Sequence, residues 1–312
     1  MKTKLVAVAA VATVLAMGVS GCGSSSSSSG SKGDGSIASQ MVFGGPPEFK
    51  TRPDGIPGLK KNYNVSFGKY KVTDVGGPVT VNALKRGQVD AVDLFTTDPS
   101  IAANDFVILQ DPKSNFAAQN VVPLINKAKA TDGVKQVING IQAKLSTETL
   151  GGLLGKVVND KADPADVAKG FLSDNGMDTP GTAAKGVSLT VGSANFPENV
   201  ILGEIYAQAL KAQGATVQTK ENIGARPKYF PALKSGSLDL FPEYTGSILA
   251  FIDQGATATS PDDVYAALGK ALPSNLVALD QAEAQDSDAV VVTKQTADKF
   301  GLKTIADLAK KG

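Results

Sequence analysis

Two stretches of the chain repeat one pattern: ALKRGQVD at residues 83–90 and ALKSGSLD at residues 232–239. Each predicts the end of a helix, with lysine in the last turn and a glycine able to take the left-handed conformation at the stop. A short apolar strand follows at once, over 89–95 in the first copy and 238–241 in the second. Because these helix-to-strand units lie far apart in the chain, we expect two similarly built α/β lobes.

The rest of the chain alternates between strand and helix patterns. The expected elements are a strand over 187–191, a helix over 197–213, a strand over 216–220, three helices within 133–175, and short apolar strands over 106–109 and 289–293. The last two have the composition of buried parallel strands. Alternation of this kind is typical of α/β lobes with mainly parallel sheets.

The first residues predict the compartment. Two lysines precede an apolar run over 5–19, and Val-Ser-Gly then leads into Cys22. This is the pattern of a secretory signal over residues 1–21 that ends in a bacterial lipobox, after which Cys22 carries diacylglycerol. The alternative is an uncleaved anchor helix with an incidental cysteine. Residues 22–35, rich in serine and glycine, predict a flexible tether that keeps the folded body at the extracytoplasmic face of the cell membrane.

The composition disfavours several kinds of chemistry. The sequence has one cysteine and no histidine, and its net charge is +1. The usual ligands of zinc and haem and the usual bases of Ser/His and Cys/His catalysis are therefore missing, as is any disulfide framework. A net charge near zero disfavours nucleic acid as a partner. We expect no cofactor and no metal, while catalysis by carboxylates alone stays open.

Five short motifs carry a family resemblance. They are GSANFPENVILGE at 192–204, DLFPEYTGS at 239–247, GGPPEF at 44–49, RPDG at 52–55 and FTTD at 95–98. Together they resemble the osmoprotectant-binding proteins of the ProX/OpuC type, the glycine betaine, carnitine and choline receptors of ABC importers. The resemblance covers nearly everything from residue 36 to 312.

The resemblance implies an α/β, two-lobed, periplasmic-binding-protein-like clamshell of type II, with ligand between the lobes. In the family, the part resembling 187–312 comes first, so we expect this chain to be circularly permuted. One lobe would comprise 113–281, and the other would combine 36–112 with 282–312. Residues 178–186, which have the composition of a linker, would join the former termini.

The resemblance also implies a ligand site. In the family a cage of tyrosines holds the quaternary ammonium group, and Tyr244 and Phe95 match two cage positions. Arg52 matches an arginine that grips the carboxylate of betaine-like ligands. Ser247 matches a hydroxyl donor to the same carboxylate, and Thr245 lies in the same turn. The alternatives are that the two aromatic residues belong to the core and that Arg52 belongs to a surface ion pair.

Other positions near the expected site depart from the family. Asn199 stands where a glutamine lines the pocket, and Ala194 where some members have a carboxylate-binding lysine. Gln119 and Asp288 fall where other members have cage tyrosines. The cage would then be half aromatic and half polar, and Asp288 could attract a cation directly. The ligand could therefore be a larger or less methylated cation than glycine betaine.

The leading hypothesis is a lipid-anchored, monomeric receptor, not an enzyme, that binds a glycine betaine- or choline-like quaternary ammonium compound. It would deliver this ligand to an ABC permease and its ATPase. One alternative is a receptor of the same fold for a different amine or for an aromatic or thiol-bearing betaine. Another is a surface hydrolase, which would need two close carboxylates with a raised pKa. A last alternative is a structural or sensory relic that no longer serves a transporter.

Overall fold

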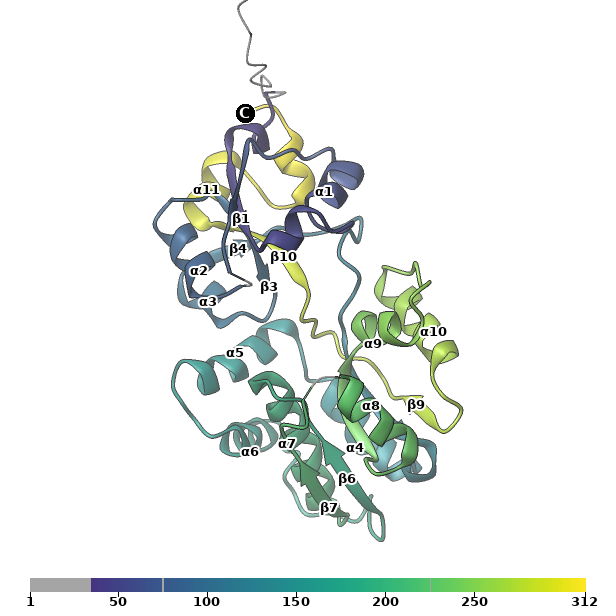
Figure 1. Ribbon diagram of the computed structural model, residues 1–312. Coiled ribbons are helices and arrows are strands. Elements are labelled where there is room, and N and C mark those ends of the chain that lie inside the picture. Colours follow the sequence, from purple (N-terminus) through teal and green to yellow (C-terminus); the bar gives the residue numbers. More distant parts are fainter. Residues whose placement is uncertain (1–34, 75, 225) are drawn as a thin grey trace, which may run out of the picture. The chain divides into compact units, whose positions relative to one another are not determined.

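The computed structural model describes residues 35–312 except 75 and 225. The predicted signal sequence, the lipidation site Cys22 and nearly all of the tether lie outside the described residues. Over the described ranges, no helix has both the length and the apolar character needed to cross a membrane. Two five-stranded sheets organise this part of the chain, each with helices packed against it, which confirms the predicted α/β class (Figure 1).

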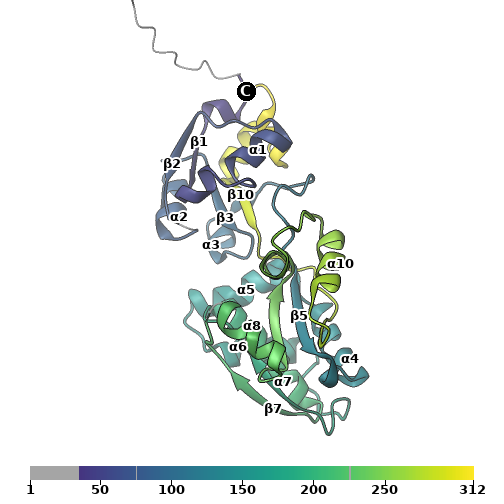
Figure 2. The same ribbon diagram turned by 45° about the vertical axis from the view of Figure 1, so that its right-hand side comes forward.

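The first sheet has the strand order β2-β1-β3-β10-β4. Its strands are β1 (Val42–Gly45), β2 (Lys69–Val72), β3 (Ala91–Phe95), β4 (Phe106–Ile108) and β10 (Asp288–Thr293). Its helices are α1 (Ile56–Tyr63), α2 (Pro78–Lys85), α3 (Pro99–Ala103) and α11 (Lys294–Phe300), with 3-10 turns η1 (Ala38–Gln40), η2 (Pro47–Lys50) and η4 (Ile305–Ala309). The yellow β10 lies beside the blue β3 in both views (Figure 1, Figure 2), although the two strands are far apart in the sequence.

The second sheet has the strand order β7-β6-β8-β5-β9. Its strands are β5 (Val121–Asn126), β6 (Ser188–Gly192), β7 (Thr216–Lys220), β8 (Leu240–Tyr244) and β9 (Leu276–Ala278). Its helices are α4 (Asp132–Gln142), α5 (Thr147–Val158), α6 (Pro164–Asp174), α7 (Pro197–Ala212), α8 (Arg226–Ser235), α9 (Thr245–Ile252) and α10 (Pro261–Ala271), with the 3-10 turn η3 (Lys127–Lys129). The predicted helices within 133–175 are confirmed as α4, α5 and α6.

The two sheets are built alike. In each, one strand runs antiparallel to both of its neighbours: β10 between β3 and β4, and β5 between β8 and β9. Each of these strands follows a segment that crosses from the other sheet, 279–287 before β10 and 109–120 before β5. This exchange of one strand is the topology of type II binding proteins. The prediction that β4 and β10 pair in parallel is wrong, because burial on both faces makes a strand apolar whatever its direction.

The repeated sequence forms the same local structure in both places. After α2, Gly87 takes a positive φ of 66°, and after α8, Gly236 takes one of 76°. The N–H groups just beyond these glycines turn back onto the helices, from Gln88 to the carbonyl of Ala83 and from Ser237 to that of Ala232, each at 2.9 Å. Since a left-handed residue followed by such back-bonding is the expected glycine stop, the predicted helix ends are confirmed.

The aspartate that ends each repeat joins two strands. Asp90 Oδ2 accepts a hydrogen bond from the N–H of Val42 at the start of β1, and Asp239 Oδ2 accepts one from the N–H of Thr190 in β6, both at 2.8 Å. The N–H groups of the two aspartates donate to the carbonyls of the same partners. Each aspartate therefore joins the strand that follows it, β3 or β8, to the neighbouring parallel strand, β1 or β6.

Replacing Asp239 by alanine should lower the free energy of unfolding by about 1.5 kcal/mol, because the N–H of Thr190 loses a charged acceptor. Denaturant unfolding of the purified protein measures the change. Asp90→Ala is the matched variant in the other sheet and should cost a similar amount, while Asp239→Asn, which keeps an oxygen, should cost less. A neutral result for both alanine variants would contradict the role of the repeat in joining the strands.

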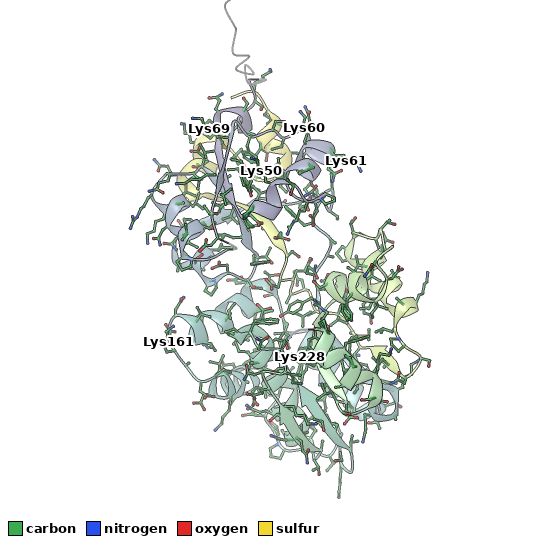
Figure 3. The ribbon with its side chains drawn as sticks, viewed as in Figure 1. Lys50, Lys60, Lys61, Lys69, Lys161 and Lys228 are labelled. Atoms are coloured by element: carbon green, nitrogen blue, oxygen red, sulfur yellow. The ribbon has the colours of Figure 1, made fainter. Side chains whose placement is uncertain are left out.

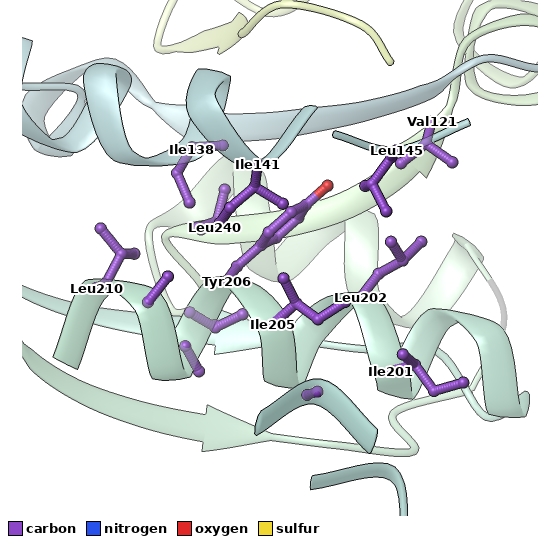
Figure 4. Packing of buried hydrophobic residues seen from close by; sticks show 14 of the residues in the cluster. Val121, Ile138, Ile141, Leu145, Ile201, Leu202, Ile205, Tyr206, Leu210 and Leu240 are labelled. Carbon is purple, nitrogen blue, oxygen red and sulfur yellow. The ribbon is translucent and has the colours of Figure 1, made fainter. Parts of the chain in front are cut away.

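The largest hydrophobic cluster packs around α7. Figure 4 shows Tyr206 of α7 among Ile138 and Ile141 of α4 and Leu240 of β8. Tyr206 is fully buried, and its hydroxyl donates to Gln142 Oε1 at 3.0 Å. Because this buried hydroxyl has a partner, the ring of Tyr206 is enclosed without leaving its own polar atom unpaired. The middle of α7 is thereby packed against α4 and β8.

Candidate functional site

Loops that follow β3 and β6 supply the walls of a cavity of about 480 Å³. Phe95 ends β3, and Thr97 and Asp98 follow it before α3 begins. On the other side, Phe196 and Glu198 lie at the start of α7, in the loop that leaves β6. Asp286, just before β10, completes the chemically distinctive part of the wall. The walls thus come from elements of both sheets, at the carboxyl ends of parallel strands, where α/β sheets commonly bind ligands.

The lining of this cavity combines aromatic faces with negative charge. It contains two phenylalanines, Phe95 and Phe196, and three carboxylates, Asp98, Glu198 and Asp286. No lysine or arginine belongs to the lining among the described residues. The lysines labelled in Figure 3 also lie outside the lining: Lys50 of η2, Lys60 and Lys61 of α1, Lys69 of β2, Lys228 of α8, and Lys161, which follows α5. We call this space the aromatic–acidic cavity.

Glu198 is the most buried carboxylate of the cavity. Its residue is 3% exposed, in the first turn of α7, and Tyr244 donates its hydroxyl to Glu198 Oε1 at 2.6 Å. Glu198 Oε2 is buried and has no hydrogen-bond partner among the described residues. Burial, and then the nearby charge of Asp286, raise the pKa of Glu198 to about 8. A buried carboxyl of this kind favours the protonated form until a positive charge arrives.

Asp286 lies in the crossing segment that leads to β10. Thr97 donates its hydroxyl to Asp286 Oδ1 at 2.8 Å, which ties this carboxylate to the loop after β3. Burial raises the pKa of Asp286, and the hydrogen bond from Thr97 opposes the shift. Its neighbours Gln285 and Ser287 line a different cavity. Neighbouring residues of this segment therefore line two different cavities.

The second cavity, of about 410 Å³, is lined by Asp288 and by residues of both crossing segments. Arg52 reaches Asp288 at 2.5 Å and Asp54 at 2.8 Å, and its guanidinium lies 5.0 Å from the ring centre of Phe49. Asp93 lies buried close by, and burial, followed by the charge of Asp288, raises its pKa to about 9. Arg52 is therefore engaged by two carboxylates, which agrees with the ion-pair alternative for this residue.

The structure separates the predicted aromatic pair. Phe95 lines the aromatic–acidic cavity, whereas Tyr244 lies behind it, buried, with its hydroxyl on Glu198. The ring centre of Phe196, which lines the cavity, lies 6.1 Å from that of Tyr244. Tyr244 thus contacts two residues of the lining, Glu198 and Phe196, without belonging to the lining itself.

The predicted polar residues of the α9 region lie together. Gln119 Oε1 accepts a hydrogen bond from the N–H of Ser247 at 2.9 Å, in the first turn of α9. Thr245 is fully buried and donates its hydroxyl to the carbonyl of Ala118 at 3.2 Å. Gln119 and Thr245 therefore brace the start of α9, and the structure brings neither into the lining of the aromatic–acidic cavity among the described residues.

Asn199 was predicted to line the pocket, but its side chain forms hydrogen bonds with two backbone groups and is not among the lining residues. Its Oδ1 accepts from the N–H of Ala194 at 2.7 Å, and its Nδ2 donates to the carbonyl of Pro242 at 2.9 Å. Both ends of the buried amide are therefore used by backbone groups of the β6 and β8 exits. Asn199 fixes the loop that carries Phe196 rather than facing the cavity.

Sequence reasoning missed most of the charged wall. Glu198, Asp98 and Phe196 all belong to the motifs quoted above, but none of them was predicted to line the site. Asp286 lies two residues before the predicted Asp288, and strand alternation would place both side chains on the same face. No sequence signal therefore separates the two, although they line different cavities.

Two α/β units that exchange one strand each, with a cavity walled by both, define the type II class of solute-binding proteins. The family model described as the substrate binding domain of ABC-type glycine betaine transport systems matches residues 32–174 and 187–312. The chain therefore belongs to this family, as the motifs predicted. Family and fold are those of transport substrate-binding proteins, which act outside the cytoplasm.

Curated relatives match smaller parts of the chain. The glycine betaine-binding protein YehZ of Escherichia coli is 31% identical over 124 residues, 38% of this chain and 41% of that protein. A glycine-betaine-binding protein of Pseudomonas aeruginosa is 26% identical over 152 residues, 48% of this chain and 49% of that protein. The ergothioneine transport permease/ergothioneine binding protein EgtU of Helicobacter pylori is 28% identical over 137 residues, 43% of this chain and 24% of that protein. The chain spans half or less of each of these relatives.

Proposed function

We propose that the aromatic–acidic cavity binds a quaternary ammonium compound and that the protein is the receptor of an ABC importer for compatible solutes of this kind. A quaternary ammonium group has diffuse positive charge and no N–H donor, so aromatic faces and nearby carboxylates are its natural partners. The observation that carries the proposal is the combination of Phe95 and Phe196 with three carboxylates in one wall.

Charge favours a ligand with a net positive charge, such as choline, over a zwitterion such as glycine betaine. The carboxylate of a zwitterion needs a cationic donor, and the lining supplies none among the described residues. Arg52, the predicted donor, is held by Asp54 and Asp288. Glu198 and Asp286, whose pKa values are both raised, would gain most from a ligand that brings uncompensated positive charge.

Binding is tested by replacing the two phenylalanines. Phe95→Ala and Phe196→Ala should each weaken choline binding by roughly 1–2 kcal/mol, about 5- to 30-fold, because each removes an aromatic face from the cation. Titration calorimetry with choline, carnitine, glycine betaine and proline betaine measures the affinities. Phe251→Ala is the matched control: Phe251 is 41% exposed and Phe196 39%, and Phe251 lies outside the cavity. If the wild-type protein bound none of the four ligands, the proposed ligand class would be refuted.

The predicted anchor and partners complete the proposal. Lipidation of Cys22 and the Ser/Gly tether would hold the receptor, as a monomer, at the outer face of the cell membrane, within reach of a permease driven by an ATPase. Family membership and the sequence of residues 1–35 support this assignment.

The circularly permuted order of the two halves is also a proposal. Residues 36 and 311 pair in an antiparallel bridge, and the N–H of Ile37 donates to the carbonyl of Lys310 at 2.8 Å. Neighbouring ends of this kind are what a permuted chain requires. The family model matches in two pieces on either side of the linker 178–186. Curated alignments that each reach less than half of the chain also fit exchanged halves, since one collinear alignment can follow only one of them.

A further inference from the structure

Among the described residues, two buried side-chain atoms of the lining have no hydrogen-bond partner: the hydroxyl oxygen of Ser100 and Oε2 of Glu198, and only the second belongs to a carboxylate. Glu198 Oε2 is shielded from solvent and receives no hydrogen bond from the described residues, although the other oxygen of the same carboxylate is bound by Tyr244 at 2.6 Å. A buried acceptor without a donor is unfavourable, and native proteins keep few such atoms without a functional reason.

The donors near Glu198 are already used. The hydroxyl of Tyr244 donates to Oε1. The hydroxyl of Thr97 lies near both Glu198 and Asp286, but it has a single proton, which it donates to Asp286 Oδ1 at 2.8 Å. The amide of Asn199, one residue along α7, is bound to the carbonyl of Pro242. Two carboxylates, Glu198 and Asp286, therefore share the single proton of Thr97, and while that proton is on Asp286 the ionised Glu198 has one acceptor position that no described side chain occupies.

A purely methylated cation cannot fill this position. Tetramethylammonium presents only C–H groups, and glycine betaine adds a carboxylate, which accepts hydrogen bonds but does not donate them. A ligand with a hydroxyl or N–H group near its cationic centre can donate to Glu198 Oε2 while the cation lies against Phe95 and Phe196. Sites with a buried polar atom discriminate strongly against ligands that leave it unpaired.

We infer that Glu198 is a specificity-determining residue of this site: it accepts a hydrogen bond from an O–H or N–H group that the ligand carries beside its cationic centre. The inference rests on the proposed function and narrows its ligand class to donor-bearing cations.

The test compares two ligands of nearly equal shape, choline and propyltrimethylammonium, in which a methyl group replaces the hydroxyl. By titration calorimetry, the wild-type protein should bind choline at least about tenfold more tightly. The double variant Glu198→Met/Tyr244→Phe removes the acceptor together with the hydroxyl that would otherwise lose its partner. There the preference should fall to within about threefold, whereas Glu283→Gln, the control that replaces an exposed carboxylate outside the cavity, should keep it.

Three results would overturn the inference in distinguishable ways. Equal wild-type affinities for both ligands would refute the role of Glu198 and leave the proposed cation site standing. A preference for choline that persists in the double variant would assign the discrimination to another group. No binding of any cation would refute the proposed function, and the inference with it. If the double variant does not fold, the wild-type comparison alone still decides whether the site requires a donor.

Discussion

Replacing Arg226 by methionine should lower the free energy of unfolding by about 3 kcal/mol, because it leaves the carboxylate of Glu243 buried without its counter-ion. The Glu243 side chain is 1% exposed at the end of β8. Arg226 donates to both of its oxygens, at 3.1 Å and 3.2 Å from Nε and at 2.9 Å from its terminal nitrogen. Tyr229 adds its hydroxyl at 2.6 Å, so the carboxylate is held by a complete set of donors until the arginine is removed.

Denaturant unfolding with two companion variants separates charge burial from lost packing. Lys294→Met breaks the Lys294–Asp298 pair, whose side chains are 54% and 65% exposed, and should change stability by less than about 0.5 kcal/mol. Adding Glu243→Leu to Arg226→Met removes the buried charge and should recover part of the loss. If Arg226→Met were as mild as Lys294→Met, the Arg226–Glu243 pair would not hold the end of β8 in the way described.

Prolines and glycines at the ends of helices made much of the fold predictable from the sequence. Pro164 and Pro197 do begin helices, and Gly87 and Gly236 do end them, because these residues have strong preferences that need no distant partner. Strand direction was not predictable for β10, since its apolar residues satisfy a parallel or an antiparallel neighbour equally well. That direction depends on which segment crosses from the other sheet, and no short window of sequence contains this information.

The site was only partly predictable, for a related reason. Phe95 was found because it ends a strand and belongs to a motif. The closeness of Glu198 and Asp286 depends on the crossing segment before β10, which brings together residues far apart in the chain. Two close acids with raised pKa values are also the feature that the hydrolase alternative required, and their spacing in the sequence could not have revealed them. The family is one of transport substrate-binding proteins, and under the proposed function a bound cation would supply the counter-charge of this pair.

The affinity for choline should rise with pH up to about 8 and then level off. Without ligand, burial and the charge of Asp286 keep the pKa of Glu198 at about 8, so the carboxyl holds a proton at neutral pH. A bound cation favours the ionised form and lowers this pKa, so binding releases a proton wherever the free carboxyl is protonated. Below pH 8 the affinity should therefore fall as pH falls, by up to about tenfold per pH unit if one proton is released.

Stability without ligand should show the matching trend. The folded pKa of Glu198, about 8, lies above the ordinary value of 4.5, so the folded state binds more protons than the unfolded state between these values. The contribution of Glu198 to the free energy of unfolding is therefore fully present below pH 4.5, and it is lost as the pH rises toward 8. A cation that neutralises the carboxylate should restore stability most at the upper end of this range.

Calorimetry at pH 6, 7, 8 and 9, in buffers with different enthalpies of ionisation, measures the affinity and the number of protons released together. Glu198→Gln, which cannot ionise, should flatten the pH dependence of choline binding, whereas Glu283→Gln, which replaces an exposed carboxylate outside the cavity, should leave it unchanged. A wild-type affinity that stays constant from pH 6 to 9 would mean that the cation is bound away from Glu198. Because glycine betaine brings its own negative charge, its binding should release fewer protons than that of choline, which makes proton release itself a measure of how much uncompensated positive charge the cavity accepts.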